Sequence, residues 1–81
     1  MINMTENHLA FDEMNDCVVS TIKLPFFDEF ETMVFGFYSN TRDVNYDELY
    51  VERYVNKDDA IDGHKRIVER AKNNEFSKNG E

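Results

Sequence analysis

Only one segment of the chain, residues 57–72, has the apolar spacing of an amphipathic helix, and this limits what the rest can fold into. On a helical wheel its apolar side chains form one stripe, and the charged ones flank it or point away. A helix with a single apolar stripe can cover only one side of the layer it packs against. The stripe consists of Ala60, Ile61, His64, Ile67, Val68 and Ala71.

The apolar segments before this helix have the composition of β-strands. Residues 17–24 are dense in β-branched side chains, and residues 30–37 and 48–55 alternate between two faces. Pro25 ends the first strand because proline cannot donate a ladder hydrogen bond, and residues 38–47 are rich in turn formers. We therefore predict an α+β fold in which a three-stranded antiparallel β-sheet packs against one C-terminal α-helix (βββα).

Side-chain alternation also predicts which side of each strand lies inward. For residues 48–55 we expect the face with Tyr50 and Tyr54 to turn toward the helix, because tyrosine can bury its ring while its hydroxyl stays wet. For residues 30–37 we expect the face with the larger side-chain volume to form the core. That face carries Glu31, Met33, Phe35 and Phe37.

The two ends of the helix have recognisable signals. Asn56 is a good N-cap, and the acidic residues Asp58 and Asp59 in the first turn suit the positive end of the helix dipole. Asn73 and Asn74 can end the helix through a left-handed residue.

These boundaries divide the chain into three parts. Residues 1–16 are predicted to be a partly flexible N-terminal arm, residues 17–72 the βββα domain, and residues 73–81 a frayed tail unless Phe76 folds back. Within the arm, the apolar residues between 9 and 14 are compatible with a helical turn, an edge strand or a flexible segment.

Composition and charge restrict the function. The 81 residues suffice for one domain, and 41% hydrophobic residues are too many for a disordered tail. The net charge is −8, and residues 1–52 hold eleven acidic and only two basic residues. Such a surface repels phosphate backbones, so we expect no direct nucleic-acid binding but a protein partner with a basic surface. The alternative is that the acidity only aids solubility.

Cellular location is predicted from the cysteine and the hydropathy pattern. A single cysteine, Cys17, rules out an intramolecular disulfide, suits a reducing cytosol and is expected to be buried and unreactive. Residues 1–16 lack the pattern of a signal peptide, and no apolar run reaches the length of a membrane span. We expect a soluble intracellular protein with no membrane partner.

No motif for catalysis, a metal or a cofactor stands out, and we predict none of the three. His64, beside Gly63 on the apolar stripe, is either an acid–base or ligand residue or a packed histidine bonded to a tyrosine or a backbone carbonyl. We favour the packed histidine because no second ligand or nucleophile stands at a telling spacing. The acids at the helix start are better explained by capping than by metal binding.

Seven phenylalanines and four tyrosines exceed what one helix can cover. They predict either an apolar patch on the open side of the sheet or a homodimer that buries it. Alternatively, the N-terminal segment with Leu9 and Phe11 covers the patch internally. The aromatic and acidic residues expected to bind a partner are Phe26, Phe27, Asp28, Glu29, Glu31, Asp43, Asp47 and Glu48.

Several short motifs resemble small proteins of unknown function encoded by bacteriophages and prophages. Those proteins share a "VSTV" strand, an "FETMVF" strand, an "ERY" strand end and a helix with "A-x-x-G-H". The resemblance covers about residues 18–72, but the short segment 25–29 stands where the family has a longer Gly/Pro-rich loop, so any function of that loop is in doubt. The matching residues here are VSTI at 19–22, FETMVFG at 30–36, ERY at 52–54, Ala60, and GHK at 63–65.

The resemblance implies phage origin and expression in the cytoplasm of a bacterial host, and it assigns no activity. With the charge, it predicts a phage accessory protein that acts by protein–protein interaction. Inhibition of a host or defence protein through an acidic, nucleic-acid-like surface is one mechanism. The alternatives are a homo-oligomeric phage structural or assembly component and a minor enzyme centred on His64.

Overall fold

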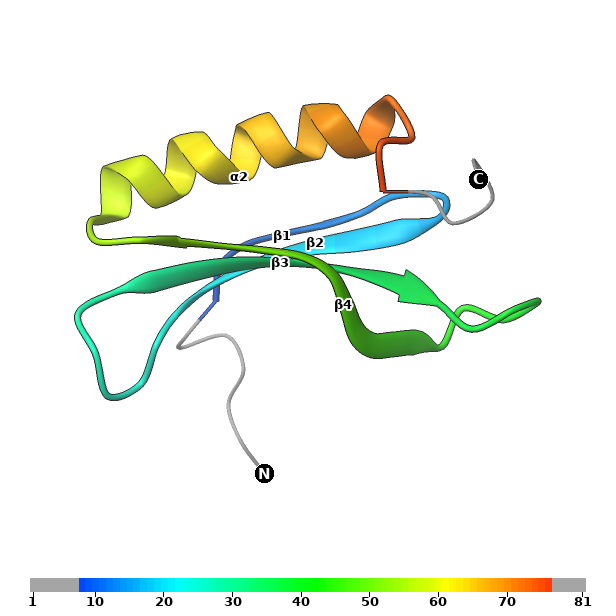
Figure 1. Ribbon diagram of the computed structural model, residues 1–81, viewed down its shortest axis with the longest axis horizontal. Coiled ribbons are helices and arrows are strands. Elements are labelled where there is room, and N and C mark those ends of the chain that lie inside the picture. Colours follow the sequence, from blue (N-terminus) through cyan, green and yellow to red (C-terminus); the bar gives the residue numbers. More distant parts are fainter. Residues whose placement is uncertain (1–7, 77–81) are drawn as a thin grey trace.

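The structure, a computed structural model, describes residues 8–76. A four-stranded antiparallel sheet carries one helix across one of its faces (Figure 1). The strands lie side by side in chain order, so the sheet is a simple meander. The α+β class and the C-terminal helix are confirmed, but the predicted number of three strands is wrong. The elements are β1 (His8–Glu13), β2 (Cys17–Lys23), β3 (Phe30–Phe37), β4 (Val44–Tyr54) and α2 (Lys57–Lys72).

The additional strand is β1, which lies in the segment predicted to be a partly flexible arm. It pairs antiparallel with β2, with Asp12 opposite Val19, and its register shifts between His8 and Ala10. Its sequence, HLAFDE, contains no β-branched residue, so local propensity gives little sign of a strand. β1 is stabilised instead by the edge that β2 offers. The folded domain therefore extends at least to residue 8, and residues 1–7 lie outside the described part.

The helix begins and ends where its capping residues predict. The side chain of Asn56 accepts a hydrogen bond of 2.8 Å from the backbone N–H of Asp59, which satisfies one of the free donors of the first turn. At the other end Asn74 adopts a left-handed conformation with φ of 61°. The next residues fold back, and the ring of Phe76 lies 5.3 Å from that of Tyr50. The tail is therefore packed as far as Phe76, and residues 77–81 lie outside the described part.

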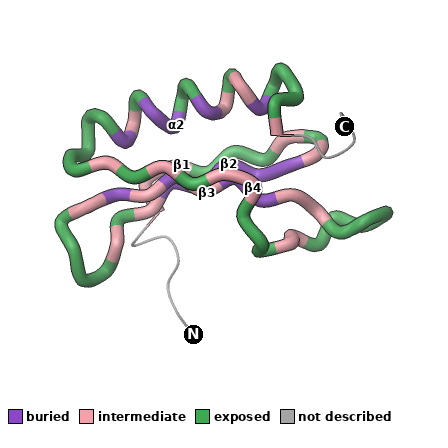
Figure 2. Tube along the Cα trace, in the orientation of Figure 1, coloured by how far each residue is buried: buried purple, intermediate pink, exposed green. Residues whose placement is uncertain are grey.

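The core lies between α2 and the two central strands. Figure 2 shows the buried parts of α2 on the side that faces the sheet. Because Val34 and Thr32 point toward the helix and are fully buried, the predicted inward face of β3 is wrong. Volume misled the prediction: at the middle of β3 the close helix leaves room for threonine and valine, and the one phenylalanine on this side, Phe30, lies at the end of the strand. The central cluster consists of Cys17, Val19, Val34, Ile67 and Ala71.

The tyrosine face of β4 turns toward the helix, as predicted. Tyr50 packs against the core cluster, and Leu49, its neighbour in the chain, does so too. Two successive residues can share one face only where the strand bulges, and the register between β3 and β4 shifts at this point. The bulge changes the direction of β4, whose first half bends away from α2 (Figure 1).

Gly63 allows one side chain to approach the helix backbone very closely. A Cβ atom placed on Gly63 would lie 2.2 Å from the hydroxyl oxygen of Tyr54, which is far inside van der Waals contact. A glycine within a helix often admits another backbone, but here the group that occupies the space is the Tyr54 ring. The glycine thus lets β4 and α2 pack together without a gap.

We expect Gly63→Ala to destabilise the protein by roughly 1–3 kcal/mol, because the new methyl group must displace the Tyr54 ring. This outcome opposes the gain of about 1 kcal/mol that alanine normally brings to a helix interior. Urea unfolding followed by circular dichroism measures the difference.

Gly36→Ala is the matched control. A Cβ atom on Gly36 would lie 3.5 Å from the nearest atom, a methyl group of Leu49, which is an ordinary contact. We expect this variant to change the free energy of unfolding by less than about 1 kcal/mol. A stabilised Gly63→Ala variant would contradict the close packing described here.

Candidate protein-binding face

The structure places the predicted partner-binding residues in two groups rather than one. Phe26, Phe27, Asp28 and Glu29 lie in the loop between β2 and β3, and the phenylalanines are 90% and 64% exposed. The second group lies at the opposite end of β3, about 25 Å away for an eight-residue strand. Both ends bend toward the side of the sheet away from α2 (Figure 1). The second group consists of Asp43, Asp47 and Glu48.

Glu31, the remaining predicted contact residue, is not free to meet a partner. Its carboxylate accepts a hydrogen bond of 2.9 Å from Nε of Arg53 on the neighbouring strand, and its side chain is only 12% exposed. This ion pair crosses from β3 to β4 on the side away from the helix. Glu31 therefore contributes to the sheet itself, and little of its side chain is accessible to a partner.

The side of the sheet away from α2, here called the open face, is covered in its centre and exposed at its margins. Val18 and Phe35 are buried there although no helix lies over them, and the ring of Phe35 packs edge-on against Tyr46 at 5.2 Å. Phe11 on β1 and Val51 on β4 are 53% and 38% exposed. The partly or largely exposed apolar residues of the open face are Phe11, Ile22, Met33, Tyr46 and Val51.

The described part of the N-terminal segment, His8–Glu13, does not cover this patch. Because Asp12 reaches toward the helix, alternation places its neighbour Phe11 on the open face, with more than half of its surface exposed. β1 thus widens the sheet and adds an aromatic ring to the open face. Among the described residues, the alternative of internal cover by Leu9 and Phe11 is wrong.

Five acids at the two ends of the open face form no ion pair within residues 8–76. Five acids are paired with a neighbouring arginine or lysine; these are Glu13, Glu31, Glu52, Glu69 and Glu75. The unpaired acids Asp28 and Glu29 at one end, and Asp43, Asp47 and Glu48 at the other, are here called the acidic ends. Their charge is not compensated locally and acts on whatever approaches the open face.

His64, the residue with the strongest chemical interest in the sequence, joins a buried chain of polar groups. Its Nε2 lies 2.7 Å from a carboxylate oxygen of Asp12 on β1, and its Nδ1 lies 2.7 Å from the hydroxyl of Thr21 on β2. The hydroxyl of Thr21 in turn contacts that of Thr32 on β3. The predicted partners, a tyrosine or a backbone carbonyl, are wrong, because β1 was not predicted to pass under the helix.

Carboxylate, imidazole and hydroxyl follow one another here as in a nucleophilic triad. A triad needs a hydroxyl that substrate can reach, however, and Thr21 and Thr32 are fully buried while His64 is 4% exposed. The packed histidine is therefore the interpretation that fits the geometry. This series of hydrogen bonds pairs polar groups that would otherwise be unpaired in the core, and it links α2 to three strands.

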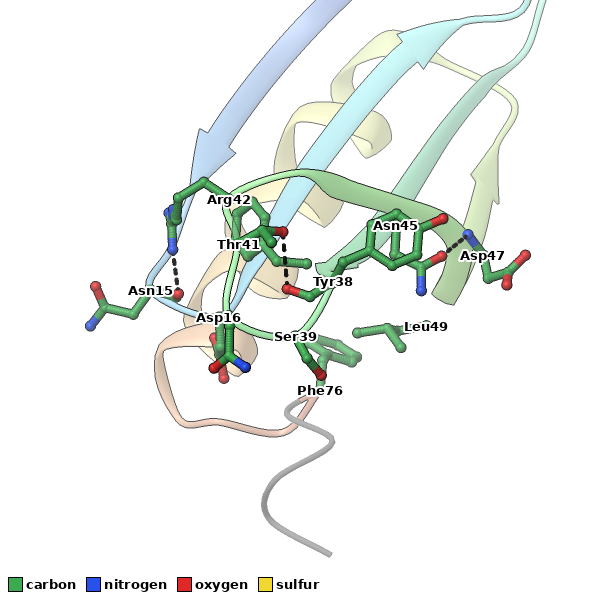
Figure 3. Close-up of a pocket in the computed structure, with 13 residues that line it drawn as sticks. Asn15, Asp16, Tyr38, Ser39, Thr41, Arg42, Asn45, Asp47, Leu49 and Phe76 are labelled. Carbon is green, nitrogen blue, oxygen red and sulfur yellow. Dashed lines mark hydrogen bonds between the residues drawn. The ribbon is translucent and has the colours of Figure 1, made fainter.

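A pocket of about 290 Å³ lies beside the second acidic end, between the turn from β1 to β2 and the turn from β3 to β4 (Figure 3). Arg42 connects these two turns: its guanidinium donates to the carbonyl of Asn15 at 2.7 Å and to that of Met14 at 3.1 Å. The same group lies 4.1 Å above the centre of the Phe37 ring. Because these contacts occupy Arg42, the pocket offers no free cation to an anionic ligand. Sequence reasoning missed this contact, which spans 27 residues of the chain.

Residues 8–76 contain neither a cluster of metal-binding side chains nor a membrane-spanning helix. That part contains no group of three or more histidine, cysteine, aspartate or glutamate residues placed to hold a metal ion. Its helix is neither long nor apolar enough to span a membrane.

Comparison with known proteins adds no relative: no family model matches the chain, and neither the curated proteins nor the solved structures give a match. The resemblance to phage proteins therefore stays a prediction.

The buried polar chain predicts the outcome of an isosteric substitution. Thr21→Val keeps the side-chain volume but leaves Nδ1 of His64 and the hydroxyl of Thr32 without their partner. We expect a loss of about 1–3 kcal/mol in the free energy of unfolding, measured by urea titration. Thr21→Ser keeps the hydroxyl and should cost only about 1 kcal/mol, for one methyl group. Equal stability of the valine variant and the native protein would show that this series of buried hydrogen bonds contributes nothing to the free energy of unfolding.

A second prediction concerns Cys17. Burial, with the nearby negative charge of Asp16, raises the pKa of the Cys17 thiol to about 11. Since only the thiolate reacts, roughly one molecule in a thousand is reactive at pH 8, apart from the burial of the sulfur itself. We expect labelling by a disulfide reagent to be slow in buffer and fast in about 6 M urea. Rapid labelling of the folded protein would contradict this environment.

Proposed function

We propose that this protein is a protein-binding module whose open face takes a partner surface that is both apolar and basic. The observation that carries the proposal is the arrangement on one side of the sheet, where exposed apolar residues lie between two acidic ends. Phe11, Tyr46 and Val51 provide apolar contact area, and the exposed Phe27 extends it at one end. Aromatic anchors inside a charged rim are typical of protein-binding surfaces.

The arrangement of the acids refines the expected mechanism. A surface that imitates a nucleic acid needs an uninterrupted row of negative charges at phosphate spacing. Here roughly 25 Å of strand separates the two acidic ends, and the surface between them carries exposed apolar side chains and one ion pair, Glu31–Arg53. This supports a partner that presents basic groups on either side of an apolar centre. Inhibition of a host or defence protein, in the cytoplasm of a bacterial host infected by a phage, is the setting that we propose for it.

Self-association is the second candidate function, and the same exposed apolar residues favour it. A homo-oligomeric structural or assembly component would bury Phe11 and Val51 against a copy of the chain. The net charge of −8 opposes this, because the acidic ends of two copies would meet. Sedimentation velocity at about physiological salt distinguishes the candidates, since a stable dimer or larger species supports self-association.

Charge reversal at the two acidic ends tests the proposal. We expect both Asp28→Lys/Glu29→Lys and Asp47→Lys/Glu48→Lys to weaken capture of the partner from infected-host lysate by about tenfold or more, because each removes attraction to basic groups. Capture by the native protein should also fall between about 50 mM and about 500 mM NaCl, because salt screens exposed charges.

The matched control reverses two acids on exposed positions of α2, in Asp62→Lys/Glu69→Lys. It changes the net charge by the same amount but leaves the open face unaltered. We expect this variant to capture the partner like the native protein. Binding that ignores both salt and the reversals at the acidic ends would refute the proposed face.

A further inference from the structure

One edge of the sheet is prepared to accept another strand. β4 is the outermost strand on its side, so one row of its backbone N–H and C=O groups pairs with no strand among residues 8–76. From Tyr50 to Tyr54 it pairs with Val34 to Phe30 without any register shift. A straight, regularly paired edge of this kind is the usual template for strand addition.

The straight stretch is only weakly protected as an edge, by the charged residues Glu52 and Arg53. Residues 50–54 contain no proline and no lysine, and the one arginine, Arg53, is held by Glu31. Glu52 is likewise held by Arg66 at 2.9 Å. Although partial burial opposes it, this arginine keeps the pKa of Glu52 below its ordinary value, so the pair is charged at neutral pH. The other edge differs: β1 has six residues and an irregular register.

Exposed apolar side chains accompany this edge. Val51 is 38% exposed on the open face, and Val55, directly after the strand, is 74% exposed. By contrast, Val18 and Phe35 on the central strands are buried. The apolar surface still available on this half of the sheet thus lies where an additional strand would cover it.

The two acidic ends lie at the two ends of the same stretch. Asp47 and Glu48 precede it in β4. The loop with Asp28 and Glu29 leads into Phe30, which pairs with Tyr54 at the far end. An extended segment placed along residues 50–55 would therefore meet negative charge near both of its ends.

We propose that the partner segment binds as an extended β-strand along Tyr50–Val55, with apolar side chains at alternate positions and basic residues at both ends. This inference deepens the proposed function and rests on it. Main-chain hydrogen bonds to β4 would hold the segment, Val51 and Val55 would receive its apolar side chains, and the acidic ends would fix its position.

A second copy of this chain fits the edge poorly. A two-fold axis through the centre of the stretch would place Glu52 opposite its own copy, and an axis one residue further along would do the same to Arg53. Like charges directly opposite each other destabilise a strand pair. An axis through Val51 would bring Arg53 opposite Leu49, inside the bulge. A foreign strand with its own charge pattern avoids these conflicts.

The test uses a synthetic peptide, Lys-Lys-Val-Thr-Val-Thr-Val-Lys-Lys, and the same peptide methylated on the backbone nitrogen of all five valines and threonines, because alternate donors face opposite edges of a strand. Methylation removes main-chain donors but keeps the charge and the apolar side chains. We expect the unmethylated peptide to bind the full chain and the methylated one to bind about tenfold more weakly or worse, by isothermal titration. Binding of the first should also slow hydrogen exchange of edge-facing amides within residues 50–55.

Each other result overturns the inference in a distinguishable way. If both peptides bind equally, or if exchange slows only around Phe11 and Met33, the segment docks on the open face without strand pairing, and the proposed function survives. If neither peptide binds while lysate capture still depends on the acidic ends, the partner is not an extended segment. If the free protein is a dimer with slow exchange at residues 50–54, the edge belongs to a second copy. Failure of the lysate experiment as well would remove the proposed function itself.

Discussion

The imidazole of His64 connects α2 to β1 and β2, and the rest of the fold depends on this connection. One ring nitrogen meets Asp12 on the edge strand, the other meets Thr21 on the next strand, and the helix backbone carries the ring down onto the sheet. Two short contacts of 2.7 Å require the helix to lie close, and a close helix favours small residues directly beneath it. Alanine, threonine and valine accordingly fill the middle of that side, the tyrosines of β4 pack beside them, and the rings of Phe11 and Phe35 lie on the other side.

The open face is the counterpart of this packing. Phe35 and Phe11 project there; Phe35 is covered by neighbours such as Tyr46, whereas more than half of Phe11 stays exposed. The fold thus gains a tightly packed, polar-linked interior at the cost of exposed apolar surface elsewhere. In a small domain such surface is tolerated most easily where it serves an interaction.

The sequence predicted those features of the fold that depend on neighbouring residues in the chain. The bounds of α2 and β3, the Asn56 cap and the inward tyrosines of β4 follow from capping chemistry and side-chain alternation. The strand β1 could not be predicted in this way, because His8–Glu13 becomes a strand by pairing with β2 and not through the propensity of its own residues. The core side of β3 was wrong because side-chain volume says nothing about how close a helix lies.

The sequence could in principle have predicted that the expected contact residues form two separate groups. Successive turns of an antiparallel meander leave the sheet at alternate ends, so residues 26–29 and 43–48 had to lie apart in any such fold. What no sequence pattern shows is that both ends bend to the same side. At the β4 end the bend coincides with the register shifts in the pairing of β3 with β4, next to Leu49.

The unequal edges of the sheet also govern how copies of this protein behave at high concentration. Unlimited ribbon growth requires one molecule's outer strand to match the opposite margin of the next, repeatedly and in register. Here β4, a long edge strand, would have to pair with β1, which is short and has an irregular register near its start. Growth by edge-to-edge pairing therefore stops at its first step. The protein can expose the edge of β4 without nucleating fibres.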